Sequence, residues 1–278
     1  MSLLRLAAPG VAITVDASHG GKLRSLLGAD GREWLAQSPP APVEPVEPAP
    51  AAFTDDLSGW DECAPTIDAC EVDGRSLPDH GDLWSASWTV VEHSSTRLVM
   101  SARGESLGYE LTRAIEVRPG GMTIDYTATS NNGDLPFLWA AHPQFVASAT
   151  TRVVLEPGID RVVEVLGDED VPFAWTPDLA TAGTLEPGGF RKLYVDPAMR
   201  PTMATLVHDD DASLELRFTG CDYLGLWFDR AGYSTETVIA LEPSTGYRDS
   251  LAWAIENGTA ARIPSGGALR WSLALDLD

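Results

Sequence analysis

The stretch between residues 87 and 129 is a series of short β-like segments separated by turn residues. Apolar and polar residues mix in these segments, although the alternation is imperfect, as is typical of strands that bury one face and expose the other. Strands are predicted at 87–92, 96–102, 109–117 and 122–129. Connections this short favour an antiparallel meander, and this constrains the fold more than any other feature of the chain.

Similar segments occur on both sides of the meander. An N-terminal hairpin is predicted, and later strands follow, at 11–15, 22–27, 152–155, 161–166, 203–207, 213–218, 223–228, 238–242 and 270–275. One short helix is predicted, with Asp249 or Ser250 as its N-cap and Gly258 at its end. So many strands with so few helices predict an all-β fold, a large antiparallel β-sandwich. No fixed-period repeat indicates a propeller or a solenoid.

The segment 38–50 is rich in Pro, Ala, Val and Glu and is predicted to be an extended loop, because proline lacks the backbone donor that a central strand needs. It could also be a linker between domains, but the part of the chain that precedes it is short for a domain. We therefore expect one domain over residues 1–278.

The net charge of the chain is −22, with 41 acidic against 19 basic residues. Nucleic acids and anionic membranes need clustered positive charge on their partner, so neither is expected to bind. A neutral small molecule fits this charge best.

The three cysteines form no pattern typical of a disulfide framework or a metal site, and no signal peptide or membrane-spanning run is present in the sequence. We therefore expect a cytoplasmic protein, a monomer or a homodimer.

Three ionisable residues are candidates for chemistry. Glu242 follows the apolar run Val238–Leu241 and precedes Pro243, which predicts a carboxylate at the end of a buried strand. His142 follows the apolar segment 136–141 in the same way. Burial and neighbouring charge can adjust such groups for acid or base catalysis. Equally, Glu242 could bond only to the following turn, and His142 could be a core histidine bonded to backbone.

His80 lies between Asp79 and Asp82 in a predicted turn that also contains Trp84. A loop histidine of this kind is usually solvated, but tryptophans in irregular segments, Trp60 and Trp84, are expected to pack or to offer a stacking face. The run His208 to Asp211 falls between two predicted strands and is interpreted as a hairpin turn. No metal site and no cofactor are expected.

Together, Asp79-His80-Gly81-Asp82-Leu83-Trp84, Ala141-His142-Pro143, and Leu241-Glu242-Pro243 with Thr245-Gly246 resemble the aldose 1-epimerase (galactose mutarotase-like) superfamily. The chain order, two histidines and then a glutamate near the C-terminus, is similar to that family. The segment from Gly59 to Ile67 is similar to a divergent branch of it. The resemblance covers roughly residues 59 to 275.

This resemblance implies a galactose mutarotase-like supersandwich with a sugar in a cleft across one sheet, and an enzyme that interconverts the α and β anomers of an aldose without a cofactor. Glu242 would be the general base at the anomeric hydroxyl, and His142 the general acid at the ring oxygen. His80 would hold the sugar near that oxygen. Trp60 or Trp84 would stack on the sugar, and Asp82 would also contact it.

Two features depart from the family pattern. Typical members have a Gly-Arg and Asn-Arg segment before the first histidine, and here 60–67 occupies that region. An Asp that binds sugar hydroxyls is also expected between the second histidine and the glutamate, for which Asp178 and Asp229 are candidates. Alternatives are a sugar-phosphate epimerase, for which Arg75, Arg191, Lys192 and Arg248 could form a basic cluster, a non-catalytic carbohydrate-binding protein, and a polysaccharide lyase or hydrolase.

Overall fold

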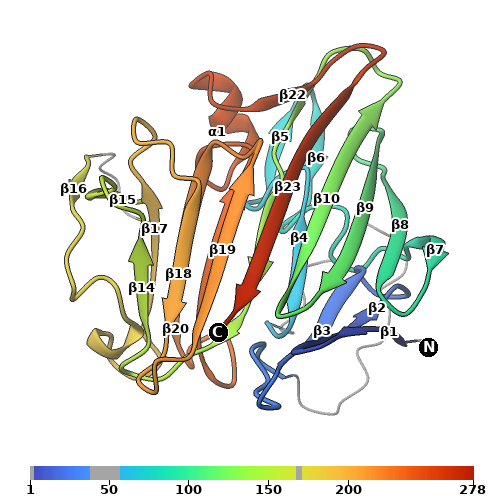
Figure 1. Cartoon of the computed structure of the whole chain (residues 1–278). Coiled ribbons are helices and arrows are strands. Elements are labelled where there is room, and N and C mark those ends of the chain that lie inside the picture. Colours follow the sequence, from blue (N-terminus) through green and yellow to red (C-terminus); the bar gives the residue numbers. More distant parts are fainter. Residues whose placement is uncertain (1–2, 38–56, 167–170) are drawn as a thin grey trace.

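Two large antiparallel sheets form most of the computed structural model, which describes residues 3–37, 57–166 and 171–278 (Figure 1). The larger sheet has 11 strands in the order β1-β2-β3-β4-β12-β21-β20-β17-β15-β16, and β13 pairs with β21 beside this path. The second sheet has eight strands in the order β14-β18-β19-β23-β10-β9-β8-β7. The all-β sandwich predicted from the strand pattern is therefore confirmed.

The strands of the larger sheet are β1 (Leu3–Ala8), β2 (Val11–Asp16), β3 (Lys22–Gly28), β4 (Trp60–Cys63), β12 (Ala140–Pro143), β13 (Phe145–Val146), β15 (Arg161–Glu164), β16 (Phe173–Ala174), β17 (Phe190–Val195), β20 (Tyr223–Arg230) and β21 (Thr237–Ser244). Those of the second sheet are β7 (Thr89–His93), β8 (Arg97–Gly104), β9 (Tyr109–Arg118), β10 (Gly121–Ser130), β14 (Arg152–Leu155), β18 (Met203–Val207), β19 (Ser213–Thr219) and β23 (Ala268–Leu277). Two small ribbons pair β5 (Cys70–Val72) with β6 (Arg75–Leu77), and β11 (Leu135–Phe137) with β22 (Ala261–Ile263).

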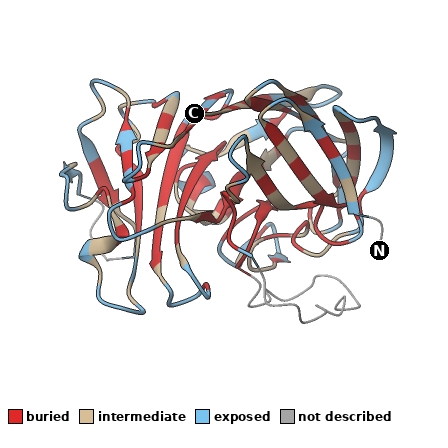
Figure 2. Ribbon diagram, turned by 60° about the horizontal axis from the view of Figure 1, so that its bottom comes forward, coloured by how far each residue is buried: buried red, intermediate tan, exposed pale blue. Residues whose placement is uncertain are grey.

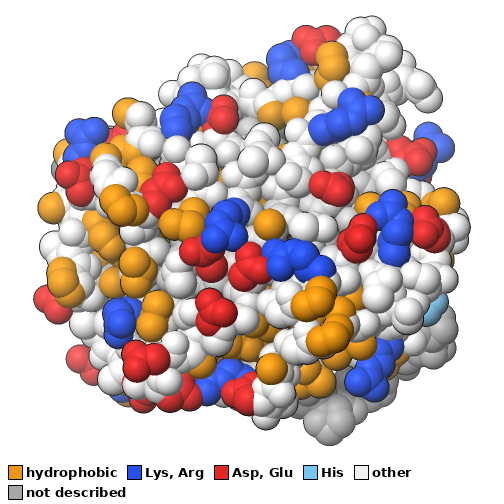
Figure 3. Space-filling view, viewed as in Figure 1, with side chains coloured by type: hydrophobic (Ala, Val, Ile, Leu, Met, Phe, Trp, Pro, Cys, Tyr) orange, Lys and Arg blue, Asp and Glu red, His pale blue; other side chains and the backbone are white. Residues whose placement is uncertain are grey.

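The predicted meander corresponds to β7, β8, β9 and β10, which pair in sequence. In β9 every second residue is buried, from Tyr109 to Val117, and the residues between them are more exposed. These buried side chains face the larger sheet and form the core between the two layers, where red segments adjoin in Figure 2. Figure 3 shows acidic and basic side chains interspersed on the outer face of the second sheet, where Asp276 pairs with Arg118 and Arg217.

The middle of the larger sheet is buried on both faces. In β21 all residues after Thr237 are buried, and in β4 and β12 all four residues are buried. Strands of this kind lack the alternating pattern, because neither face meets water. β4 and β17 were not predicted as strands, whereas the apolar runs at 136–141 and 238–242 were. The segment containing Trp60, which was predicted to be irregular, is strand β4, so that prediction was wrong.

Two further boundaries differ from the prediction. β21 does not end at Glu242 but continues through Pro243 to Ser244, so Glu242 lies inside the sheet opposite Gly225 of β20. His142 lies within β12 and not after a strand.

The helix α1 (Leu251–Glu256) has Ser250 as its N-cap, and Gly258 follows it with φ 67°. A single turn of 3₁₀ helix, η1 (Ala182–Thr184), is also present. The proline-rich loop at 38–50 lies outside the described residues.

Within the described ranges, no helix is long and apolar enough to cross a membrane.

Candidate active site

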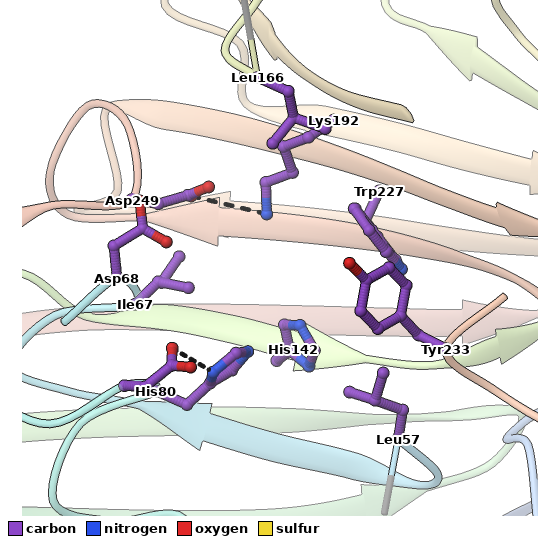
Figure 4. Close-up of a pocket in the computed structure, with 11 residues that line it drawn as sticks. Leu57, Ile67, Asp68, His80, His142, Leu166, Lys192, Trp227, Tyr233 and Asp249 are labelled. Carbon is purple, nitrogen blue, oxygen red and sulfur yellow. Dashed lines mark hydrogen bonds and ion pairs between the residues drawn. The ribbon is translucent and has the colours of Figure 1, made fainter. Parts of the chain in front are cut away.

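A cavity of about 240 Å³ opens on the face of the larger sheet that points away from the second sheet. It is lined by Leu57, Ile67, Asp68, Asp79, His80, His142, Leu166, Lys192, Trp227, Tyr233 and Asp249. Figure 4 shows Asp68 and Asp249 at one end and Trp227 and Tyr233 at the other, with Lys192 and the two histidines on opposite sides between them. The cavity therefore has an acidic end and an aromatic end.

The register of the central strands brings His142, Glu242 and Lys192 together. Side chains of directly paired residues point to the same face of a sheet. His142 pairs with Asp61 of β4, Glu242 pairs with Gly225 of β20, and Lys192 of β17 pairs with Trp227 on β20. As a result, three residues far apart in the sequence project from neighbouring strands toward one place.

His142 and Glu242 are in direct proximity, with His142 Nε2 3.7 Å from Glu242 Oε1. On the other side of the ring, the Gln144 amide nitrogen lies 3.1 Å from His142 Nδ1. This contact with Gln144 holds the ring so that Nε2 faces the Glu242 carboxylate.

Glu242 lies below the cavity and not in its wall, since its exposed fraction is 0%. The Lys192 ammonium donates to its Oε2, while Oε1 accepts no hydrogen bond from any residue that the structure describes. Burial raises the pKa of the Glu242 carboxyl above its ordinary value of 4.5, although the charge of Lys192 opposes that shift. A Cβ at residue 225 would lie 2.9 Å from Glu242 Oε2, so a larger residue there would displace the carboxylate.

The pKa of His142 is shifted in the opposite direction. Burial holds it well below the ordinary 6.5, and the charges of His80, Lys192 and Lys22 act in the same sense. Burial thus disfavours the charged forms of both groups, which raises the pKa of Glu242 and lowers that of His142.

Lys192 bridges two carboxylates. Its Nζ donates to Glu242 and lies 3.6 Å from Asp249 Oδ1, to which the Tyr194 hydroxyl donates over 2.7 Å. Burial opposes the charge on Lys192, but Asp249 and Glu242 outweigh burial and raise the pKa of the ammonium. Lys192 is therefore a fixed cation at the cavity wall.

His80 approaches the cavity from the loop that follows β6. Both His80 and Gly81 have positive φ, 58° and 76°, and a Cβ at residue 81 would lie 2.0 Å from the Ala64 carbonyl oxygen. The glycine therefore allows the loop to lie directly against the end of β4. His80 Nδ1 is 2.9 Å from Asp79, and its ring meets that of His142 with centroids 5.2 Å apart.

Of the other residues predicted at the site, Trp84 is the one in contact with the two histidines. Its buried ring contacts both histidines, with centroids 4.8 Å from His80 and 5.7 Å from His142, so it supports them from behind the cavity wall. Trp60 is fully buried against Phe145 in the core and does not line the cavity.

The three predicted aspartates also lie outside the cavity lining. Asp82 accepts hydrogen bonds from the backbone and hydroxyl of Ser106, at 3.2 and 2.7 Å. Asp178 is exposed, and its carbonyl accepts from Thr184. Asp229 is fully buried and accepts from the backbone N–H groups of residues 232, 233 and 234. It therefore orders the turn that places Tyr233 in the cavity wall.

The sequence analysis did not predict Trp227, Tyr233, Asp68 or Asp249 as site residues, and it considered Lys192 only for phosphate binding. One signal for Lys192 is available in the sequence: a lysine between Phe190 and Tyr194 at alternate positions of an apolar strand needs a buried anionic partner. Asp249 was interpreted as a possible helix cap, but Ser250 has that role and the Asp249 side chain points to Lys192.

The basic cluster considered for a sugar phosphate does not form at the cavity. Arg75 donates to the Ser106 carbonyl, Arg191 donates to the carbonyls of Leu179 and Thr181, and the Arg248 guanidinium lies over the Trp253 ring. Only Lys192 of the four candidates lines the cavity.

The segment His208 to Asp211 forms the turn between β18 and β19, as predicted, and His208 N–H donates to the Ala212 carbonyl. Among the described residues, no group of three or more His, Cys, Asp or Glu side chains is arranged to hold a metal ion.

No protein-family model matches the sequence, and no curated relative matches it. Solved structures do match. A galactose mutarotase-like protein from Lactobacillus casei shares 19% identity over 100% of both chains, with a TM-score of 0.76. A protein from Escherichia coli K12, described as a candidate aldose 1-epimerase, shares 15% identity over 100% of this chain and 99% of its own, with a TM-score of 0.76.

A galactose mutarotase related enzyme from Lactobacillus acidophilus shares 12% identity over 100% of this chain and 97% of its own, with a TM-score of 0.71. At identities this low the likeness concerns the fold, and it extends over the whole chain. The resemblance predicted from the histidine and glutamate motifs is confirmed at that level: the protein has the galactose mutarotase-like fold.

Proposed function

We propose that the protein is an enzyme of the aldose 1-epimerase type, which interconverts the α and β anomers of a neutral aldose by opening and closing its ring. One observation carries the proposal: His142 Nε2 and Glu242 Oε1 lie 3.7 Å apart beside a cavity with carboxylates at one end and aromatic rings at the other. The names of the structural neighbours from Lactobacillus and Escherichia support the same class of reaction.

The reaction requires a base and an acid at two oxygens bonded to one carbon. Glu242 Oε1 takes the proton of the anomeric hydroxyl, and His142 Nε2 gives a proton to the ring oxygen as the bond between that oxygen and the anomeric carbon breaks. The open-chain aldehyde rotates about its first carbon–carbon bond, and the reverse transfers close the ring on the other face. Because the two oxygens share a carbon, acid and base must lie side by side and not across a sugar ring. Positioned proton transfer contributes ~10² to 10⁴-fold.

Lys192 and Asp249 complete this proposal. Lys192 binds Glu242 Oε2 and leaves Oε1, the oxygen that faces His142, for the anomeric hydroxyl. Asp249 lies 3.6 Å from Nζ and gives the ammonium a second anionic partner. When Glu242 takes the proton it loses its charge, and Asp249 then keeps the buried ammonium paired. We therefore assign Lys192 and Asp249 as positioning residues for the base.

Different parts of the cavity bind different parts of the sugar in this proposal. Asp68, Asp79 and His80 offer hydrogen-bonding groups for hydroxyls, while Trp227 and Tyr233 offer flat faces for the C–H surface of the ring. An anionic sugar phosphate is disfavoured, because the lining includes three aspartates and its one lysine is bound to carboxylates. A single domain, a cytoplasmic location and a monomeric or dimeric state stay predictions from the sequence alone.

The experiment is an NMR exchange measurement of anomer interconversion for a panel of neutral aldoses, with and without the purified protein. We expect acceleration for at least one of them, and no inhibition by millimolar inorganic phosphate. Absence of acceleration across the panel would reject the proposal. Inhibition by phosphate would instead favour a sugar-phosphate substrate.

The pH dependence should reveal the protonation states of the pair. The base requires ionised Glu242, so kcat/KM falls as pH decreases through a pKa that burial raises above 4.5. The acid requires protonated His142, so kcat/KM falls as pH rises through a pKa that burial holds well below 6.5. We expect a bell-shaped profile with its maximum on the acid side of 6.5. A rate that stays high from neutral to alkaline pH would assign the base role to neutral His142 and the acid role to Lys192.

A further inference from the structure

Three aromatic side chains form a continuous cluster that begins in the cavity wall and extends onto the surface. The Phe190 ring stacks on Trp227 with centroids 5.3 Å apart, and Tyr233 contacts both, at 4.9 Å from Phe190 and 5.6 Å from Trp227. Trp227 and Tyr233 line the cavity, while Phe190 lies beyond its lining. Phe190 is 41% exposed and Tyr233 is 50% exposed.

The sheet register places this aromatic platform (Phe190, Trp227 and Tyr233) next to the ionisable residues. Phe190 and Lys192 are two residues apart on β17 and therefore share a face, and Trp227 pairs with Lys192. Tyr233 is held by the turn that Asp229 orders through three backbone N–H groups. The platform is thus a built extension of the cavity, at the end opposite Asp68 and Asp249 (Figure 4).

We propose that the aromatic platform is a second subsite, which binds the sugar ring next to the reacting one, so that the preferred substrate is the reducing end of a short neutral oligosaccharide. This inference rests on the proposed function, since it places the reacting aldose at His142 and Glu242. In a reducing disaccharide only the terminal ring has a free anomeric hydroxyl, and the other ring must lie outside the catalytic cavity.

The chemistry of the platform fits a pyranose. Aromatic rings pack against the C–H face of a sugar while its hydroxyls stay in water, so exposed rings of this kind suit an amphipathic ring. Asp229, which orders the turn, is buried and bonded to backbone, so the platform presents no charge from that residue. Because the platform continues the wall of the cavity, a ligand that fills the cavity also reaches it.

The test compares kcat/KM for glucose with kcat/KM for maltose and cellobiose, its two 1,4-linked disaccharides. We expect the wild type to prefer at least one disaccharide. Phe190→Ala should lower the ratio of disaccharide to monosaccharide kcat/KM about three- to tenfold, the contribution of one aromatic contact. Phe173→Ala is the matched control, since Phe173 is exposed on β16 and belongs to no ring pair of the platform. An unchanged ratio in Phe190→Ala would overturn the inference.

Calorimetry on a Glu242→Gln background separates this inference from the proposed reaction. We expect the disaccharide to bind more tightly than glucose, and Phe190→Ala to remove the difference. If the wild type accelerates no aldose but this difference is found, the subsite stands and the epimerase proposal fails. If glucose and the disaccharides bind equally, the subsite is rejected whatever the activity. A change of oligomeric state in Phe190→Ala by light scattering would also reject it, since the platform would then be an interface between copies of the chain.

Discussion

Glu242→Gln should lower kcat/KM for anomer interconversion by about 10² to 10⁴-fold, the usual contribution of a positioned general base. The amide keeps the size of the carboxylate but cannot take a proton from the anomeric hydroxyl. The fold should tolerate the change, because Lys192 keeps Asp249 3.6 Å away as a partner for its charge. The measurement is the NMR exchange rate at the optimal pH, with thermal unfolding of the same samples.

Glu236→Gln is the matched control, because Glu236 is exposed just before β21 while Glu242 is buried within it. Its exchange rate should equal that of the wild type. A Glu242→Gln rate within a few-fold of the wild type, in a protein that unfolds at the same temperature, would exclude Glu242 as the base. The base would then have to be His142, which also lines the cavity.

The sequence predicted the strands of the second sheet well, and the reason is physical. β9 and β10 bury one face and expose the other, so their alternation records the two environments directly. The central strands of the larger sheet carry no such record. β4 is buried on both faces, so its sequence does not show which residues face the cavity and which face the core. Trp60 was therefore assigned to the sugar, although it lies in the core.

At the candidate site too, residues in local motifs were predicted and residues placed by long-range strand pairing were not. His80, His142 and Glu242 were found because each stands in a short motif that resembles a known family. Lys192 and Trp227 stand in no such motif, and their meaning depends on the pairing of β17 with β20, which joins residues 35 positions apart. Register between distant strands cannot be derived from local pattern. The partners of the proposed catalytic pair are therefore harder to predict than the pair itself.

The two faces of β4 show how the larger sheet supports the site. Asp61 and His142 are paired and share the cavity side, where Asp61 forms an ion pair with Lys22 over 3.0 Å. Glu62 points the opposite way, into the space between the two sheets. Its Oε1 accepts from Arg113 Nη1 over 2.6 Å and from the Tyr126 hydroxyl over 2.9 Å. This carboxylate therefore ties the strand beside His142 to β9 and β10 of the second sheet.

Glu62→Gln should reduce the free energy of unfolding by about 3–5 kcal/mol, the cost of leaving a buried charge without its partner. Glu62 and Arg113 are both fully buried, so the Arg113 guanidinium could not find water in compensation. The NH₂ of the amide would also place a donor against either Arg113 or the Trp139 indole, which now donates to Oε2 over 2.6 Å. Urea unfolding measures the loss. Glu116→Gln on β9, whose side chain is 60% exposed, should cost about 1 kcal/mol or less.

A double variant separates the attraction within this pair from the cost of burying it. Burial raises the pKa of Glu62, although Arg113, Trp139 and Tyr126 oppose the shift. Burial therefore destabilises the ionised carboxylate more than these three partners stabilise it. Glu62→Gln with Arg113→Met removes both charges and should therefore cost less than the sum of the two single variants. If the double variant costs as much as that sum, the two side chains act independently. The Glu62–Arg113 ion pair would then contribute nothing to the coupling of β4 to the second sheet.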